Sequence, residues 1–283
     1  MHIRNPVEWS VDQLRSAGHA IEGAGRARYQ DQQAPAVRDI RIADLVDCLF
    51  RGIDDFAAAR TDVVFLALVY PVLGLMLARL AFGYDLLPLV FPLVSGFALI
   101  GPLAAVGLYE MSRRREHGVE PSWADAFGLV RAPSFPAIVG LGLVLMAVFL
   151  VWLGAAMAIY DHTLGPNAPA SVGAFLRDVF ATGAGWALIG IGIGVGFLFA
   201  VLALAIGVVS FPLLVDRDVG FDIAVATSVR AVAANPVPMA VWGLIVTAAL
   251  VLGSAPLLLG LIVVMPVLGH ATWHLYRKVV VPR

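Results

Sequence analysis

Residues 231–276 read AVAANPVPMAVWGLIVTAALVLGSAPLLLGLIVVMPVLGHATWHLY, which is 46 residues without one Asp, Glu, Lys or Arg. As one straight α-helix this stretch would be roughly 70 Å long, at a rise of about 1.5 Å per residue. The hydrocarbon core of a bilayer is only about 30 Å thick. The stretch therefore predicts two membrane crossings, with a turn at Gly253-Ser254-Ala255-Pro256. It places the chain among polytopic helical membrane proteins.

The composition of the whole chain agrees with this class. Hydrophobic residues make up 60% of the 283 residues and charged residues 14%, against about 45–50% and about 25% in soluble proteins. The net charge of −1 provides no basic field of the kind that nucleic acid requires. The single cysteine, Cys48, excludes an intramolecular disulfide and a cysteine-based metal cluster.

Six apolar segments predict transmembrane helices. They lie at residues 61–82, 86–110, 135–160, 182–213, 237–253 and 256–276. The fourth is too long for an upright helix, which predicts a tilt, a kink or a projection beyond the bilayer. We therefore expect an all-α fold in which residues 61–278 form one six-span membrane domain.

Two segments precede these spans. Residues 1–40 are polar and read as a short helix followed by a linker rich in Gly and Gln. Residues 41–60 have the periodicity of an amphipathic helix, with a broad apolar stripe on one face. The charged residues assigned to the other face are Arg41, Asp44, Asp47, Arg51, Asp54 and Asp55. Because this helix leads into the first span, we expect it to lie in the membrane interface on the cytoplasmic side.

The basic residues predict the orientation. With six spans both termini lie on one side, which then holds seventeen of the nineteen Lys and Arg residues. Positive residues concentrate on the cytoplasmic side, so we expect cytoplasmic termini and a location in the bacterial inner membrane. Arg113, Arg114 and Arg115 are expected at the inner headgroup layer, where they attract anionic lipids. Glu110 is placed to pair with the first two of these arginines one helix turn away.

A weak parallel repeat relates the second and third spans to the fourth and fifth. Each unit has a span, a short cytoplasmic amphipathic segment at 120–131 or 220–230, a proline and the next span. Ser122 or Asp222 is a candidate N-cap of the short helix. A chance origin stays open, because two hairpins with linking helices resemble each other in any case.

His270 and His274 are candidate metal or haem ligands, because their i, i+4 spacing places both imidazoles on one helix face. His117 lies in a loop on the same side. Two ligands do not make a site, however, and no Asp, Glu or Cys inside a span completes one. An interfacial aromatic belt with Trp273 and Tyr276 is the simpler interpretation. We predict no metal, no cofactor and no catalytic residues, since phosphate loops and nucleophile motifs are also absent from the sequence.

Glycines cluster in the fourth span. Gly190 and Gly194, and likewise Gly192 and Gly196, have the small-x-x-x-small spacing that lets helices approach closely. We expect another helix, of the same chain or of a second copy, to cover this face. The alternative is the lining of a ligand site or a pore.

Residues 101–118 read GPLAAVGLYEMSRRREHG and follow FPLVSGF at 91–97, while IRIADL stands at 40–45 and GIDDF at 52–56. These stretches resemble a family of predicted bacterial integral membrane proteins of unknown function. The resemblance covers residues 38–275 approximately and leaves 1–37 outside. It implies a six-span inner-membrane protein and carries no known activity.

The absence of a catalytic constellation from the sequence favours a non-enzymatic accessory, scaffold or assembly protein of the inner membrane. Its expected partners are the bilayer and a membrane protein complex or a second copy of the chain, and not nucleic acid. The second hypothesis is a small-molecule or lipid transporter, which the repeat and the glycine-rich fourth span favour. A membrane enzyme ranks third.

Overall fold

The computed structural model describes residues 34–58, 87–97, 99, 101–119, 129–167, 169–256 and 258–282. These residues are helical apart from turns, loops and one isolated antiparallel bridge between Val37 and Val280. Several predictions concern parts of the chain outside the described residues. They are the N-terminal helix with most of its linker, the first span at 61–82 and the first short helix of the repeat at 120–128.

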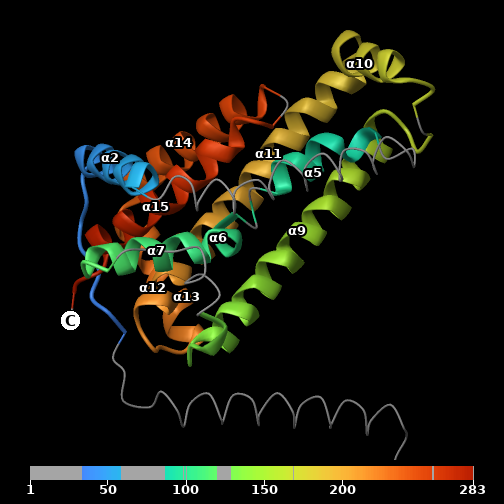
Figure 1. Ribbon diagram of the computed structural model, residues 1–283. Helices are drawn as coiled ribbons and strands as arrows, with labels where there is room; N and C mark the ends of the chain where they lie inside the picture. Colours follow the sequence, from blue (N-terminus) through green and yellow to red (C-terminus); the bar gives the residue numbers. More distant parts are fainter. Residues whose placement is uncertain are drawn as a thin grey trace, which may run out of the picture.

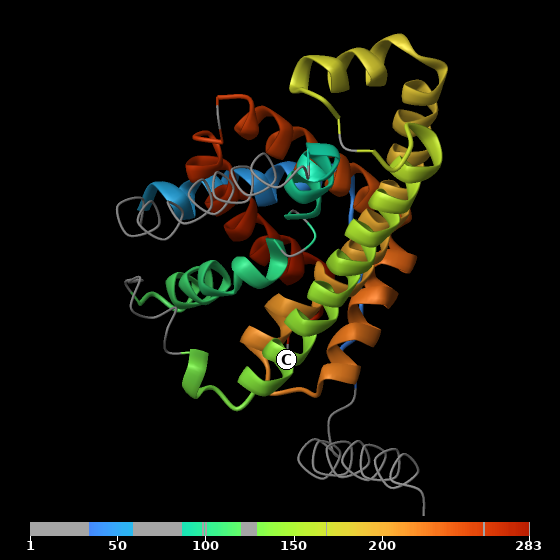
Figure 2. The same cartoon turned by 90° about the vertical axis from the view of Figure 1, so that its right-hand side faces the viewer.

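Within the described part of the chain, three helices are long and apolar enough to cross a membrane. They are α9 (Phe135–Thr163), α14 (Pro236–Ser254), and α11 (Gly183–Gly207) together with α12 (Ser210–Asp216). They correspond to the predicted spans at 135–160, 237–253 and 182–213. Figures 1 and 2 show α9 and α11 side by side along the length of the molecule, with α10 (Val172–Ala181) joining them at one end. The total of six spans stays a prediction.

A break between α11 and α12 accounts for the excess length of the fourth predicted span. Pro212 has no N–H to donate to the carbonyl of Val208, so the helical ladder is interrupted there. The amide of the residue after Val208, Val209, donates to a side chain outside its own helix, Ser228 Oγ, at 3.2 Å. The helix that supplies this serine, α13 (Phe221–Ala234), therefore satisfies the backbone of the broken span.

The short linking helix of the predicted repeat is described in full only in the second unit. There α13 lies between the fourth and fifth predicted spans. Its N-cap is Gly220, without a side-chain hydrogen bond, so the assignment of Asp222 as the cap was wrong. Asp222 lies in the first turn, where its charge favours the positive end of the helix dipole. Of the linking segment in the first unit, at 120–131, only η3 (Leu129–Arg131) is described, and the repeat stays a prediction.

The second predicted span, at 86–110, is divided into shorter helices. Its described part contains η1 (Leu87–Leu89), α5 (Val90–Phe97), α6 (Gly101–Ala104) and α7 (Val106–Glu116). Proline fits the first turn of a helix and not its interior. Pro92 and Pro102 lie in the first turns of α5 and α6, so a single continuous helix was the wrong description of this segment.

The last helix, α15 (Leu261–Val279), packs between α7 and α2 (Ile42–Ala58) (Figure 1). Twelve of its nineteen residues are buried, and it is not one of the three helices apolar enough to be recognised as a span. The contact with α2 is close, because a Cβ on Gly52 would lie 2.7 Å from the Cβ of Ala271. Glycine is therefore required at this crossing.

The amphipathic helix predicted at 41–60 forms as α2, but it has three sides and not two. The side toward α15 buries Leu45, Cys48, Gly52 and Asp55. A second side is apolar and exposed, and comprises Ile42, Val46, Phe50 and Ile53. The third side carries Asp44, Asp47 and Arg51. The assignment of Asp55 to the water-facing side was wrong, since this carboxylate is buried against α7 and α15.

The segment before α2 pairs with the end of the chain. The amide of Arg38 donates to the carbonyl of Val279 at 2.8 Å, and that of Val281 donates to Ala36 at 3.0 Å. Asn235 holds the same segment, because its side chain accepts from the Ile40 amide and donates to the carbonyl of Arg38. The early part of the chain is thus attached to its last residues, which positions α2 beside α15.

Candidate functional site

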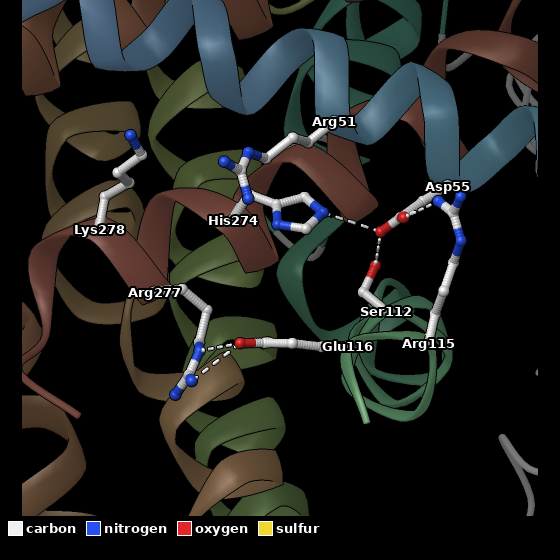
Figure 3. A pocket seen from close by; sticks show the side chains of 8 residues that line it. All are labelled: Arg51, Asp55, Ser112, Arg115, Glu116, His274, Arg277 and Lys278. Atoms are coloured by element: carbon white, nitrogen blue, oxygen red, sulfur yellow. Dashed lines mark hydrogen bonds and ion pairs between the residues drawn. The ribbon is translucent and has the colours of Figure 1, made fainter. Parts of the chain in front are cut away.

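A polar cleft of about 430 Å³ lies where α2, α7 and α15 meet. Figure 3 shows side chains from all three helices directed into it. The residues that line it are Arg51, Asp55, Ser112, Arg115, Glu116, His274, Arg277 and Lys278. All eight of these lining residues are polar or charged, and the cleft is the candidate functional site.

Asp55 is the centre of this cleft. Its Oδ2 accepts hydrogen bonds from Ser112 Oγ at 2.6 Å and from His274 Nε2 at 2.9 Å, and its Oδ1 forms an ion pair with Arg115 (Figure 3). One carboxylate on α2 therefore binds two side chains of α7 and one of α15. Charge-assisted hydrogen bonds of this kind are about twice as strong as neutral ones.

The helix periods explain why these groups converge. On α2, Asp55 follows Gly52 by three residues, so it continues the side that approaches α15. On α7, Ser112 and Arg115 are also three residues apart and share one face. The contact of Gly52 with Ala271 brings α2 and α15 close enough for the short Asp side chain to reach His274.

The surroundings keep Asp55 ionised. Burial alone raises the pKa of this carboxyl group, but the hydrogen bonds from His274 and Ser112 outweigh burial and lower the pKa to about 2. Asp55 is therefore a fixed negative charge at any ordinary pH. Its role is to hold the basic and hydroxyl groups around it, and it does not exchange protons near neutrality.

His270 lies beneath this centre, one helix turn before His274. Its Nδ1 is 2.7 Å from Ser112 Oγ. The serine hydroxyl donates its proton to Asp55, so it accepts from His270 Nδ1–H. Nε2 of His270 is buried and has no hydrogen-bond partner within the described part of the chain.

The outer half of the cleft is a second set of ion pairs. Arg277 binds Glu116, with Nε 3.0 Å and Nη2 2.9 Å from the same carboxylate oxygen (Figure 3). Trp273 Nε1 donates to the other oxygen at 3.1 Å. Lys278 reaches across to α2 and pairs with Asp44 at 3.2 Å and Asp47 at 3.0 Å. These pairs again join α15 to α7 and α2.

The geometry does not suit nucleophilic catalysis. Ser112 lies inside α7, is almost fully buried and already donates to a carboxylate. A nucleophile of the usual kind needs a base to accept its proton and backbone N–H groups aimed at a developing oxyanion. The backbone amides beside Ser112 belong to the helix, so the second requirement is not met here.

The predicted arginine cluster separates in the structure. Arg113 and Arg114 bind the buried Glu110 at 2.7 Å and 2.9 Å, which confirms the predicted pairs. Arg115 turns to Asp55 instead and enters the cleft. All three guanidinium groups thus have a protein partner, and their expected contact with anionic lipids stays a prediction.

The two predicted histidines do share one face of a helix, and both face Asp55 or its neighbour Ser112. His117 does not join them, because its Nδ1 lies beside the carbonyl of Arg113. Among the described residues, no three His, Cys, Asp or Glu side chains are arranged to hold a metal ion.

The glycine face of α11 is mostly open within the described structure. A Cβ on Gly190, Gly192 or Gly194 would meet no described atom within 4 Å, whereas one on Gly196 would lie 3.1 Å from the ring of Trp152. Of these four glycines, only Gly196 therefore has a covering side chain among the described residues. Coverage of the other three stays a prediction.

Sequence reasoning missed Asp55 and Ser112 as members of the site. For Asp55 a signal exists, since Leu45, Cys48, Gly52 and Asp55 recur at steps of three and four and so form one stripe. Because Asp55 is charged, sequence reasoning places it on the polar face with the neighbouring acidic residues instead. Ser112 gives no comparable signal, because it stands between a buried Met111 and an exposed arginine run.

Comparison with known families gives one match. Residues 90–216 match the model of a family described as "Predicted integral membrane protein (DUF2189)". The chain is similar to this family. The match includes residues 91–97 and 101–118, but not the stretches at 40–45 and 52–56. No curated protein and no solved structure matches the chain. With the three apolar helices, the match supports a predicted integral membrane protein of unknown function.

Proposed function

We propose that this chain is a non-enzymatic accessory, scaffold or assembly protein of the bacterial inner membrane. The observation that carries the proposal is that the side chains lining the cleft bind one another. Each of its eight lining side chains is bound to another side chain, and most of these bonds join two different helices. Groups used in this way hold α2, α7 and α15 together.

The proposed contact surface for a protein partner or a second copy is the glycine face of α11. It is apolar, open in the described structure and free of the bulky side chains that separate helices in a membrane. Gly194→Leu should abolish binding there without destabilising the chain, because no described atom lies in its way. The matched control is Gly154→Leu, an equally open glycine on α9.

Purification in mild detergent, followed by mass spectrometry and a measurement of oligomeric state, tests this proposal. We expect a partner or a second copy at a constant ratio to the chain. Gly194→Leu should lose it and Gly154→Leu should keep it. A chain that is always monomeric and alone, or two variants that behave alike, would contradict the proposal.

We infer six spans with cytoplasmic termini, and one observation supports this. The helices that form the cleft, α2, α7 and α15, lie at one end of the molecule with the paired segments before α2 and after α15, and α10 lies at the other end (Figure 1). Cys48 is fully buried and burial raises the pKa of its thiol to about 12, so introduced cysteines can be labelled selectively. Asn167→Cys or Ser171→Cys should react from the periplasm and Gly118→Cys should not. The reverse pattern would overturn the orientation.

Anionic lipids are proposed partners at the same end. Arg113, Arg114 and Arg115 are joined there by Arg51 and Lys278, which pair only with partly exposed carboxylates of α2. Exposed pairs contribute about 0–1 kcal/mol, so these two cations can exchange partners for a lipid phosphate. Arg51→Gln with Lys278→Gln should reduce co-purified anionic lipid, whereas Arg177→Gln at the far end should not. Equal lipid content in both would count against the proposal.

A transporter is the second candidate, and one observation favours it. The break between α11 and α12 lies beside the short helix α6, since a Cβ on Gly207 would be 3.4 Å from the ring of Pro102. Interrupted helices that meet in this way form substrate sites in many transporters. Ser210→Cys separates the two functions. A transporter should expose this buried position to a membrane-impermeant thiol reagent from at least one side, whereas an accessory protein should leave it unlabelled.

A further inference from the structure

α10 is a short helix at the end of the molecule opposite to α2, α7 and α15 (Figures 1 and 2). Ser171 Oγ caps its start by accepting from the Ala174 amide at 3.1 Å. At its end the hydroxyl of Thr182 donates to the carbonyl of Asp178 at 2.6 Å and accepts from the Gly185 amide at 2.9 Å. One residue thus ends α10 and begins α11, and it fixes the angle between them.

The junction with α11 is tight. A Cβ on Gly185 would lie 2.2 Å from the carbonyl oxygens of Asp178 and Val179, so the two backbones touch there. On the side of α9, the ring of Phe175 packs on Tyr160 with centroids 6.4 Å apart. α10 is therefore a built part of the fold, and its orientation toward the rest of the chain is set by contacts on two sides.

A third side of α10 is apolar and about half exposed within the described structure. Side chains at i, i+4 and i+8 form it: Val172, Leu176 and Phe180, which are 46%, 48% and 59% exposed. Arg177 and Asp178 stand on the remaining side. Val179 is the one buried residue of α10. Three large apolar side chains on one side of this ten-residue helix favour an apolar environment for that side.

The position of α10 shows which environment is available. α11 is a candidate span and begins directly after Thr182. In its first turn Trp186 is 61% exposed, and tryptophan is enriched at the level of the lipid headgroups. Further along α11, Ile191 and Ile193 are exposed as well. The apolar side of α10 is thus attached to the boundary of a surface that already faces lipid.

We propose that α10 is an interfacial helix that inserts Val172, Leu176 and Phe180 among the lipids of the leaflet opposite the cleft. Its polar side, with Arg177, then faces water and headgroups, as in other helices that lie in the membrane plane. Three side chains are far fewer than a stable protein interface needs, at about 1,000 Å² or more. The same division into a packed, an apolar and a charged side occurs in α2 at the other end.

Site-specific fluorescence in vesicles tests this proposal. Leu176→Cys and the neighbouring Arg177→Cys are each labelled with an environment-sensitive nitrobenzoxadiazole probe, which is selective because the native Cys48 is buried. The full chain is reconstituted at a low protein-to-lipid ratio into phosphatidylcholine–phosphatidylglycerol vesicles, with and without lipids brominated in their acyl chains. The probe at 176 should emit at shorter wavelength and lose several-fold more intensity to bromine than the probe at 177.

Two results would overturn the proposal. If both probes respond equally and are quenched by aqueous iodide, the apolar side of α10 faces water. If the probe at 176 is shielded from bromine and from iodide alike, protein covers this side. The protein would then be diluted further in lipid. If dilution exposes the probe, a second copy covers this side. If the quenching does not change, another part of the same chain covers it.

Discussion

α14 and the first sixteen residues of α15 come from the same uncharged stretch of 46 residues, whereas the last turn of α15 carries Arg277 and Lys278, and the surroundings of the two helices differ. Three of the nineteen residues of α14 are buried, against twelve of the nineteen in α15. Leu252 on α14 is 72% exposed, whereas Leu275 on α15 has no exposed surface. The absence of charge therefore indicates that a segment can leave water. It does not indicate whether lipid or protein takes the place of the water.

The polar residues of the two helices distinguish them. α15 carries His270 and His274, which bind side chains of α7 and α2. In α14 the hydroxyl of Thr247 donates to the carbonyl of Gly243 in its own helix. Buried polar groups need partners, so an uncharged helix with several polar side chains is suited to contact with protein. One with almost none is suited to lipid.

Truncation of one leucine on each helix is the strongest test of this difference. Leu275→Ala should lower the free energy of unfolding in detergent by about 2–5 kcal/mol, because it leaves a cavity in a packed core. Leu252→Ala should change it by less than about 0.5 kcal/mol, as exposed substitutions usually do. Denaturant titration of both variants measures this. Similar losses would show that α14 is packed as closely as α15.

A glycine pair tests the close contact of α15 with α2. Gly52→Val should destabilise the chain by about 1–3 kcal/mol through overpacking, since its side chain would overlap Ala271 and the carbonyl of Val267. The control is Gly194→Val on α11, where no described atom lies near, and its unfolding midpoint should not change. If Gly52→Val is tolerated, α2 is not held against α15 in solution.

Asp55→Asn removes the charge at the centre of the cleft. The pKa falls from 3.8 to about 2 on folding, which corresponds to about 2 kcal/mol of stability at neutral pH. A lowered pKa gives stability that is complete above about 4 and is lost as the pH falls toward 2. The variant should therefore be less stable than the wild type at pH 7 and should converge with it near pH 2. The exposed neighbour Asp54→Asn should show little change, and a pH-independent gap would contradict the assignment.

The smallest effect is expected from a pair of threonines. Thr272 on α15 is buried and Thr247 on α14 is exposed, and each hydroxyl donates to a carbonyl of its own helix at 2.7 Å or 2.8 Å. Thr272→Val should cost about 0.5–1 kcal/mol, the usual net value of one hydrogen bond. Thr247→Val should cost nothing, because a methyl group suits lipid. Melting curves of the two variants, recorded in the same detergent, compare them directly.

The sequence was sufficient to predict three of the long apolar helices, the pairs of Glu110 and the excess length of the fourth predicted span, for which a kink was one of three alternatives. These features depend on hydropathy, proline chemistry and neighbours one turn apart, all of which are local. The cleft could not be predicted in the same way. Asp55 binds partners 57 and 219 residues further along the chain, and such contacts follow from the packing of helices. The glycine spacing in α11 likewise indicates that close contact is possible, but not which helix makes it.

The long separation in sequence between α2 and α15 has a consequence for biosynthesis. At about 5–20 residues per second, roughly 10–45 s pass on the ribosome between Asp55 and His274. During this time Leu45 and Cys48 have no partner from α15, and the bilayer surface is the apolar support within reach. We expect nascent α2 to rest on lipid with both of its apolar sides and later to exchange lipid for α15 on one of them. Cys48 would then be open to thiol reagents in a ribosome-bound chain stalled before α15 and closed in the finished protein.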